Sequence, residues 1–167
     1  MTDETETHRA PYVISWRDGF KVNIPTTDAE HKHLFRLIAA LNLQTVDQTV
    51  EELLDYVVVH FSNEQELMEA SGYPAYGDHL KLHEEFGAQV AEFLAGGDPW
   101  SEERISDLRR FLNKWLIGHI MTHDMRFGKW YEKQKANKGV INRVSQSPQS
   151  SQSPQAHKGF FARLFGG

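Results

Sequence analysis

The stretch QTVEELLDYVVVHFSNEQELMEASGYP, residues 48–74, decides the fold. Its apolar residues recur at spacings of three and four, the period of an amphipathic α-helix. SGYP at 71–74 ends the pattern, because glycine and proline both terminate helices. The stretch therefore predicts one long helix that starts at about Asp47 or Gln48, ends at about Ala70, and has an apolar stripe made of Val50, Leu53, Leu54, Val57, Val58 and Phe61.

Three further segments show the same period. The first covers about 28–43 and begins at TTDAE, where Thr27 and Glu30 have the spacing of a capping box. The others cover about 75–94 and about 101–134, the latter starting at Ser101, a favourable N-cap. Four helices joined by short loops predict an all-α fold, an antiparallel up-down-up-down four-helix bundle.

Two terminal segments lie outside the expected bundle, which covers 26–135. Residues 1–25 are expected to form an N-terminal arm, anchored on the bundle by Trp16 and Phe20. Residues 136–167 are expected to form a disordered tail, because their flexible linker is rich in Ser, Gln and Pro. The tail ends in a short amphipathic segment, 156–167, that predicts docking on a protein groove or an anionic membrane surface, the alternative being a frayed end without a partner.

Composition excludes several classes of function. Cysteine is absent from the 167 residues, which excludes disulfides, thiolate zinc sites, iron–sulfur clusters and thiol catalysis. The net charge of −5 hides an acidic body, since all residues after Glu132 are neutral or basic. Such a body argues against nucleic acid as a partner. With no apolar run of 18 residues and a polar N-terminus, the chain is expected to be cytoplasmic, and peripheral to a membrane only through its C-terminal segment. It is also expected to be monomeric.

Histidines and carboxylates are placed so that a bundle would gather them at one end. In an antiparallel bundle the start of the first helix faces the end of the second, the start of the third and the end of the fourth. Nitrogen and oxygen donors without sulfur suit iron, manganese, zinc or copper, and their number favours two ions. The candidates are His31 on the first helix, His60 and Glu64 on the second, His79 and His83 on the third, and His119, His123 and Asp124 on the fourth.

A single His and Glu four residues apart is more often a solvated pair than a ligand pair. The spacing also leaves the choice of ligand open on the fourth helix and on the first. On an ideal α-helix His123 shares the face of His119, whereas Asp124 lies about 140° away. A second carboxylate bridge favours Asp124, and one wide π turn would bring it inward. His33 similarly competes with His31 on the first helix.

Four strings carry one His, then H-x-x-x-E, H-x-x-x-H and H-x-x-x-x-D: they are TDAEHKHLF (27–35), HFSNEQELM (60–68), YPAYGDHLKLHEEF (73–86) and WLIGHIMTHD (115–124). Together they resemble the hemerythrin family, and specifically its bacterial members, over roughly 12–132. The resemblance selects His31 over His33, and Asp124 over His123. The sequence departs from the family at Glu30, where the family often has Gln.

The resemblance implies a centre of two non-haem iron ions per chain, joined by an oxo or hydroxo bridge. It places His79, His83 and His119 on one iron, His31 and His60 on the other, and Glu64 and Asp124 between the two.

The implied function is reversible dioxygen binding for storage, delivery or sensing, and not an enzyme. The alternative is a di-iron redox enzyme of the oxidase, peroxidase or nitric oxide reductase type, but such enzymes usually rely on more carboxylates. The family's oxygen pocket corresponds to Leu34, Phe86, Trp115, Leu116 and Ile120.

Overall fold

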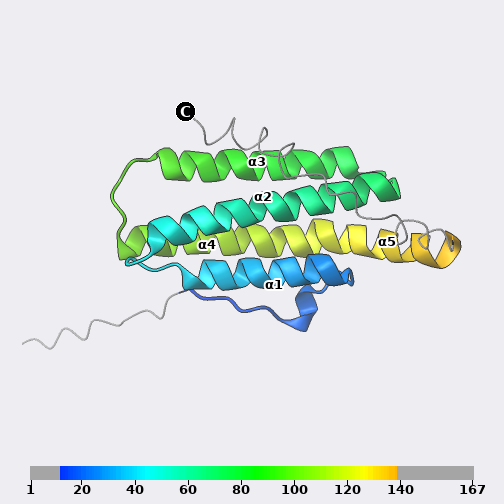
Figure 1. The fold of residues 1–167 in the computed structure, drawn as a ribbon, viewed down its shortest axis with the longest axis horizontal. Coiled ribbons are helices and arrows are strands. Elements are labelled where there is room, and N and C mark those ends of the chain that lie inside the picture. Colours follow the sequence, from blue (N-terminus) through cyan, green and yellow to red (C-terminus); the bar gives the residue numbers. More distant parts are fainter. Residues whose placement is uncertain (1–11, 139–167) are drawn as a thin grey trace, which may run out of the picture.

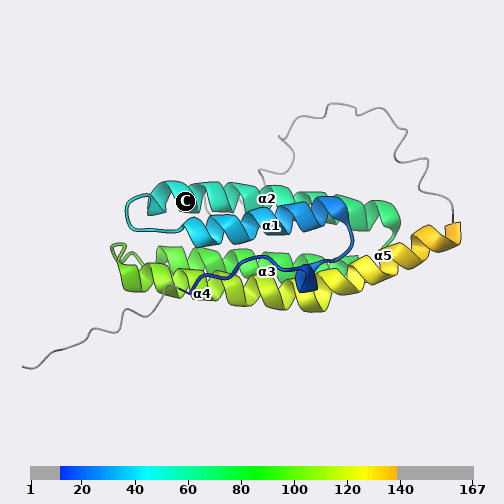
Figure 2. The ribbon, with the colours of Figure 1, turned by 90° about the horizontal axis from the view of Figure 1, so that it is seen from below.

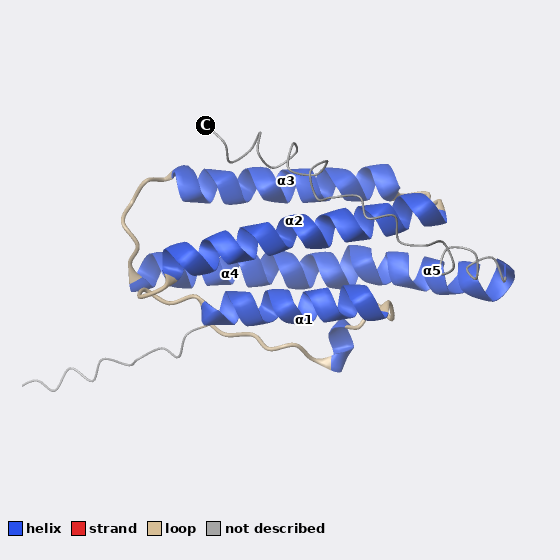
Figure 3. Ribbon diagram, viewed as in Figure 1, coloured by secondary structure: helices blue, strands red, loops and turns tan. Residues whose placement is uncertain are grey.

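The computed structural model describes residues 12–138, and within that range it contains helices and loops but no strand (Figure 3). The residues beyond 138, which include the predicted docking segment, lie outside the described part. A short helix, η1 (Asp18–Phe20), precedes the bundle. The bundle consists of α1 (Pro25–Ala40), α2 (Val46–Ser71), α3 (Tyr76–Ala95), α4 (Glu102–His119), η2 (Ile120–Asp124) and α5 (Met125–Lys138).

The helices form an antiparallel bundle (Figure 1). Successive helices α1 to α4 run in alternating directions, and α1 lies beside both α2 and α4 while α3 lies beside α2. The elements α4, η2 and α5 follow one another as a single long rod, whose last part projects beyond the other helices (Figure 2). The predicted all-α, up-down-up-down four-helix bundle is confirmed.

Helix α1 begins earlier and ends earlier than its periodicity predicts. It starts at Pro25, a residue suited to the first helical turn because its missing N–H needs no partner there. The predicted capping box is not formed. Instead, Asp28 Oδ1 accepts a hydrogen bond from the Val22 backbone N–H at 2.8 Å and so ties the arm to the helix. Asn42 ends the helix by donating from its side chain to the Ala40 carbonyl.

The other helix ends agree with the sequence signals to within a few residues. Gly72 terminates α2 in the left-handed conformation, φ 71°, which costs glycine little. Ser101 caps α4 as predicted, since its side chain accepts a hydrogen bond from the Arg104 backbone N–H at 3.1 Å.

The N-terminal arm packs on α1 through the two aromatic residues expected to anchor it. The Phe20 ring stacks on Phe35 with a centroid distance of 5.3 Å, and Trp16 contacts both rings edge-on. Phe20 is almost fully buried. The arm therefore extends the apolar core past the four helices.

No helix in the described range is long and apolar enough to cross a lipid bilayer.

Candidate metal centre

Seven polar side chains are buried together at the end of the bundle where α1 begins. They come from α1, α2, α3, α4 and η2, so each of the four long helical segments of the bundle contributes. Burial of this many ionisable groups is costly unless they find partners. None is more than 4% exposed, and they are His31, His60, Glu64, His79, His83, His119 and Asp124.

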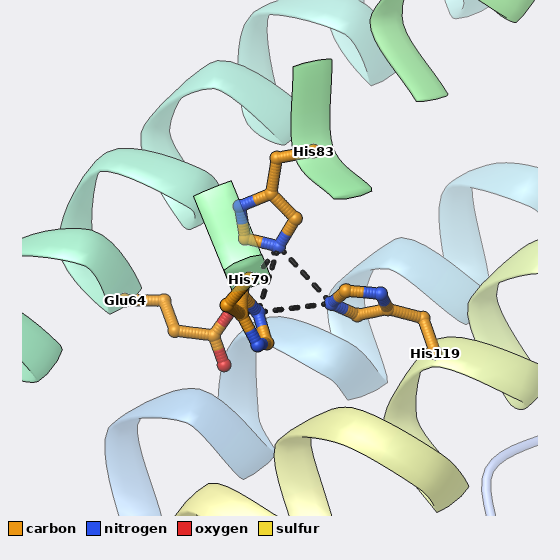
Figure 4. A group of neighbouring side chains, drawn as sticks. All are labelled: Glu64, His79, His83 and His119. Atoms are coloured by element: carbon orange, nitrogen blue, oxygen red, sulfur yellow. Dashed lines mark hydrogen bonds and ion pairs between the residues drawn. The ribbon is translucent and has the colours of Figure 1, made fainter. Parts of the chain in front are cut away.

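Three imidazole nitrogens form a nearly equilateral triangle (Figure 4). The Nε2 atoms of His79 and His83 are 3.1 Å apart, and each lies 3.0 Å from Nε2 of His119. For metal–nitrogen bonds of about 2.1 Å, ligands at 90° are about 3.0 Å apart and tetrahedral ligands about 3.4 Å apart. The triangle therefore fits one face of an octahedral ion.

Glu64 and Asp124 lie between this triangle and His31. Glu64 Oε2 is 3.2 Å from His79 Nε2. Asp124 Oδ1 is 3.1 Å from His119 Nε2, and its other oxygen, Oδ2, is 3.3 Å from His31 Nε2. Glu64 belongs to two compact groups of donor atoms, one with the three histidines of the triangle and one with His31 and Asp124. Each of the two groups could hold a metal ion, and Glu64 is common to both.

Several buried atoms of this cluster lack a hydrogen bond. They are both ring nitrogens of His31, Oε1 of Glu64 and both oxygens of Asp124, although Asp124 lies at ion-pair distance from its neighbours. Buried polar atoms in folded proteins are nearly always satisfied. Because lone pairs converge here without enough protons to share, a cation is the partner that these residues fit.

Burial and mutual charge shift the pKa values of several cluster residues. Burial raises the pKa of Glu64 to about 8, and the charge of Asp124 adds to the rise. Burial also acts to raise the pKa of Asp124, but His119 and His31 outweigh it and hold that pKa well below its usual range. Burial, helped by the neighbouring histidines, lowers the pKa of His83 well below its ordinary value. This shift favours the neutral form of the His83 ring, the form in which an imidazole binds a metal.

A π turn determines which residue of the rod formed by α4, η2 and α5 lies in the cluster. The Met125 N–H bonds the Ile120 carbonyl, five residues back, within η2. The wide turn brings Asp124 to full burial, whereas His123 stays only partly buried with its ring 5.3 Å from that of His119. The predicted π turn is confirmed, and Asp124 rather than His123 lies among the other candidates.

His33 also lies away from the cluster. Its Nδ1 accepts a hydrogen bond from Arg36, and its ring packs on Tyr56. His31, two residues earlier, is fully buried and faces Asp124.

His60 is one of the seven buried side chains but belongs to neither compact group of donor atoms. Its ring centroid is 4.8 Å from that of His31, and its Nδ1 bonds Glu30 Oε2 at 2.8 Å. The other oxygen of Glu30 accepts a hydrogen bond from Asn63 at 2.7 Å. Sequence reasoning missed Asn63, although its position three residues after His60 puts both on one helix face.

A small apolar cavity of about 20 Å³ lies next to the cluster. Four of the five residues predicted for an oxygen pocket line it: Leu34, Phe86, Trp115 and Leu116. The fifth, Ile120, is fully buried but does not line this cavity. The Trp115 ring stacks on His119 at 4.4 Å, so the cavity and the candidate ligands share a wall.

Comparison with known proteins supports a metal-binding domain. The family model described as "Hemerythrin HHE cation binding domain" matches residues 22–131. The chain is 32% identical over 125 residues to a bacteriohemerythrin from Stenotrophomonas maltophilia (strain R551-3), covering 69% of this chain and 79% of the relative.

Two other relatives point the same way. A bacteriohemerythrin from Pseudomonas aeruginosa (strain LESB58) is 33% identical over 66% of this chain and 76% of its own. A myohemerythrin from Theromyzon tessulatum is 32% identical over 70% of this chain and 92% of its own. These names are those of hemerythrins and not of enzymes. The chain belongs to the hemerythrin family.

Proposed function

We propose that this protein binds dioxygen reversibly at a centre of two non-haem iron ions, in the service of oxygen storage, delivery or sensing. One observation carries the proposal. Two fully buried carboxylates, Glu64 and Asp124, lie between a triangle of three imidazole nitrogens and the imidazole of His31. When bound there, a pair of iron ions supplies electrons and an open coordination position for dioxygen.

The proposed ligand roles follow the two groups of donor atoms. His79, His83 and His119 would hold one iron, and His31 and His60 would hold the other. Glu64 and Asp124 would bridge the ions together with an oxo or hydroxo group. The carboxylate oxygens that make no hydrogen bond, Oε1 of Glu64 and both oxygens of Asp124, support these bridging roles.

The side chains next to the cluster would protect the bound oxygen. Leu34, Phe86, Trp115 and Leu116 line a cavity whose walls carry no titratable side chain, so nothing there can donate a proton. Its volume of about 20 Å³ is enough for a small guest. A dry apolar pocket of this kind excludes water and limits side reactions. We propose that these residues, together with the fully buried Ile120, form the oxygen pocket.

The alternative of a di-iron redox enzyme has less support from the site. Carboxylate-rich di-iron sites in ferritin-like bundles take four glutamates and two histidines. Here five histidines accompany two carboxylates. The excess of neutral ligands favours reversible binding over oxidative chemistry.

The test is an anaerobic and aerobic titration of the purified, iron-loaded protein. We expect two iron ions per chain and a visible absorption band that appears with air, disappears on deoxygenation and returns with air. Metal-free protein is the control and should show no such band. Rapid, irreversible oxidation after one exposure to air would contradict the carrier function and favour the enzyme.

A further inference from the structure

Glu30 links the first two helices beside the cluster. It precedes His31 on α1, and its side chain is 14% exposed. Oε2 accepts a hydrogen bond from His60 Nδ1 at 2.8 Å, and Oε1 accepts one from Asn63 Nδ2 at 2.7 Å. The carboxylate is therefore held at both oxygens by two residues of α2.

This contact determines which nitrogen of His60 carries the proton. A carboxylate accepts but does not donate, so Nδ1 must be the protonated nitrogen. In the neutral ring, the form in which imidazole binds a metal, Nε2 then carries the free lone pair. Glu30 thus prepares His60 to act as a ligand through Nε2, while the hydrogen bond restrains rotation of the ring.

Glu30 also gives the outward nitrogen of His60 an anionic partner, unlike those of His31 and His83. The Nδ1 atom of His83 has the neutral amide of Gln65 at 3.4 Å. The Nδ1 atom of His31 has no protein partner. Of these three histidines, His60 is the one whose outward nitrogen is paired with an anion.

We propose that Glu30 is a positioning residue that orients His60 and biases the iron centre toward its oxidised state. This inference rests on the proposed function. A carboxylate hydrogen-bonded to a ligating imidazole makes the ring a stronger electron donor, which stabilises the more highly charged ion. Because Glu30 is largely shielded from solvent, its charge is screened less than that of a surface glutamate.

The hydrogen bond can be tested without iron. In ¹⁵N-histidine-labelled protein, both metal-free and loaded with Zn²⁺, we expect a strongly downfield His60 Nδ1–H proton, assigned by its loss in His60→Ala. Glu30→Gln, which keeps an acceptor oxygen, should move this proton upfield, and Glu30→Ala should abolish the resonance. Circular dichroism melts verify that each variant is folded. An unchanged resonance in both folded Glu30 variants would overturn the positioning role.

The electronic effect is tested by the reduction potential of the iron-loaded protein. Glu30→Gln should lower the preference for ferric over ferrous iron about tenfold, which is about 59 mV for a one-electron couple. The matched control is Glu52→Gln, which removes the same charge from an exposed position on α2 and should leave the potential unchanged.

An unchanged potential in Glu30→Gln, with normal iron content, would overturn the proposed bias. If the unaltered protein binds no iron, the proposed function fails, and the proton resonance still decides whether Glu30 positions His60.

Discussion

At the scale of single residues, Glu64 connects the two halves of the candidate centre. Its Oε2 lies 3.2 Å from His79 Nε2, while its Oε1 is buried without a hydrogen-bond partner. We expect Glu64→Ala to reduce metal affinity by more than the roughly 10–100-fold loss typical of removing an outer-shell partner. Iron per chain, measured after aerobic purification, checks this. Glu69→Ala, an exposed position on the same helix, should keep its iron. Full iron retention in Glu64→Ala would refute the bridging role.

The raised pKa of Glu64 has a consequence for the metal-free protein. The carboxyl stays protonated up to about pH 8 in the folded state but ionises near 4.5 when unfolded. The folded state then binds the extra proton, so stability falls as the pH rises between these values. From about pH 6.5 to pH 8, the free energy of unfolding should fall by about 2 kcal/mol. Below about pH 6.5 the lowered pKa values of His79 and His83 act in the opposite direction.

Urea unfolding of metal-free protein at pH 6.5 and 8.0 measures this loss. Glu64→Gln cannot ionise and should remove most of the dependence on pH. A metal-free protein that is equally stable at both pH values would contradict the raised pKa.

At the scale of elements, the π turn η2 resolves a conflict in the sequence. Regular α-helical geometry would place His123 on the face of His119, and one extra residue in the turn places Asp124 there instead. The sequence supported the π turn only through the resemblance and the need for a second carboxylate. Periodicity alone favoured His123, which the structure leaves only partly buried, because periodicity assumes an unbroken helix.

Removing one residue from η2 should convert it to a regular α-helical turn. Met121 is 52% exposed, and its deletion would leave Asp124 four positions after His119, on the same face. We expect this variant to fold and keep its metal, as judged by iron content and helical circular dichroism. Deleting exposed Lys114 from regular α4 is the matched control, and it should lose metal because it rotates His119 by about 100°. Metal loss on deleting Met121, with the fold intact, would show that the wide turn itself is required.

A second prediction at this scale concerns the contact between the arm and α5. A Cβ added to Gly128 would clash with the Val22 carbonyl oxygen, whereas one added to Gly118 would meet nothing. Gly128→Ala should therefore destabilise the protein by about 1–3 kcal/mol. Gly118→Ala should be neutral or stabilising by up to about 1 kcal/mol, since alanine is the better helix former. Thermal unfolding of both variants measures the difference, and equal melting temperatures would contradict the close packing of the arm.

At the scale of the whole molecule, the antiparallel bundle brings distant segments to one end. His31 and Asp124 are 93 positions apart in the chain, yet their side chains are 3.3 Å apart. The predicted docking segment, 156–167, lies outside the described residues and stays a prediction, as do the cytoplasmic location and the monomeric state.

Deleting residues 156–167 tests whether this segment binds membranes. Each basic residue near an anionic surface contributes about 1 kcal/mol. Lys158 and Arg163 together would then strengthen binding by about 2 kcal/mol, or roughly 30-fold. The full chain should therefore co-sediment with vesicles containing anionic lipid, and the shortened chain should not, while both retain the same iron content. Equal partitioning of the two chains would remove the membrane from the candidate partners.

The sequence by itself determined the four helices and the set of metal-capable side chains. Helical periodicity and ligand spacing are local properties, written in residues three to five positions apart. Tertiary structure decided the rest: that α1 starts at Pro25 with Asp28 bonded to the arm, that Asp124 replaces His123, and that Glu30 pairs with His60. The contact of Glu30 with His60 joins residues 30 positions apart, which a local pattern cannot encode. The contacts of Asp28 with Val22 and of Met125 with Ile120 are local, but they depart from the regular helix geometry that periodicity assumes.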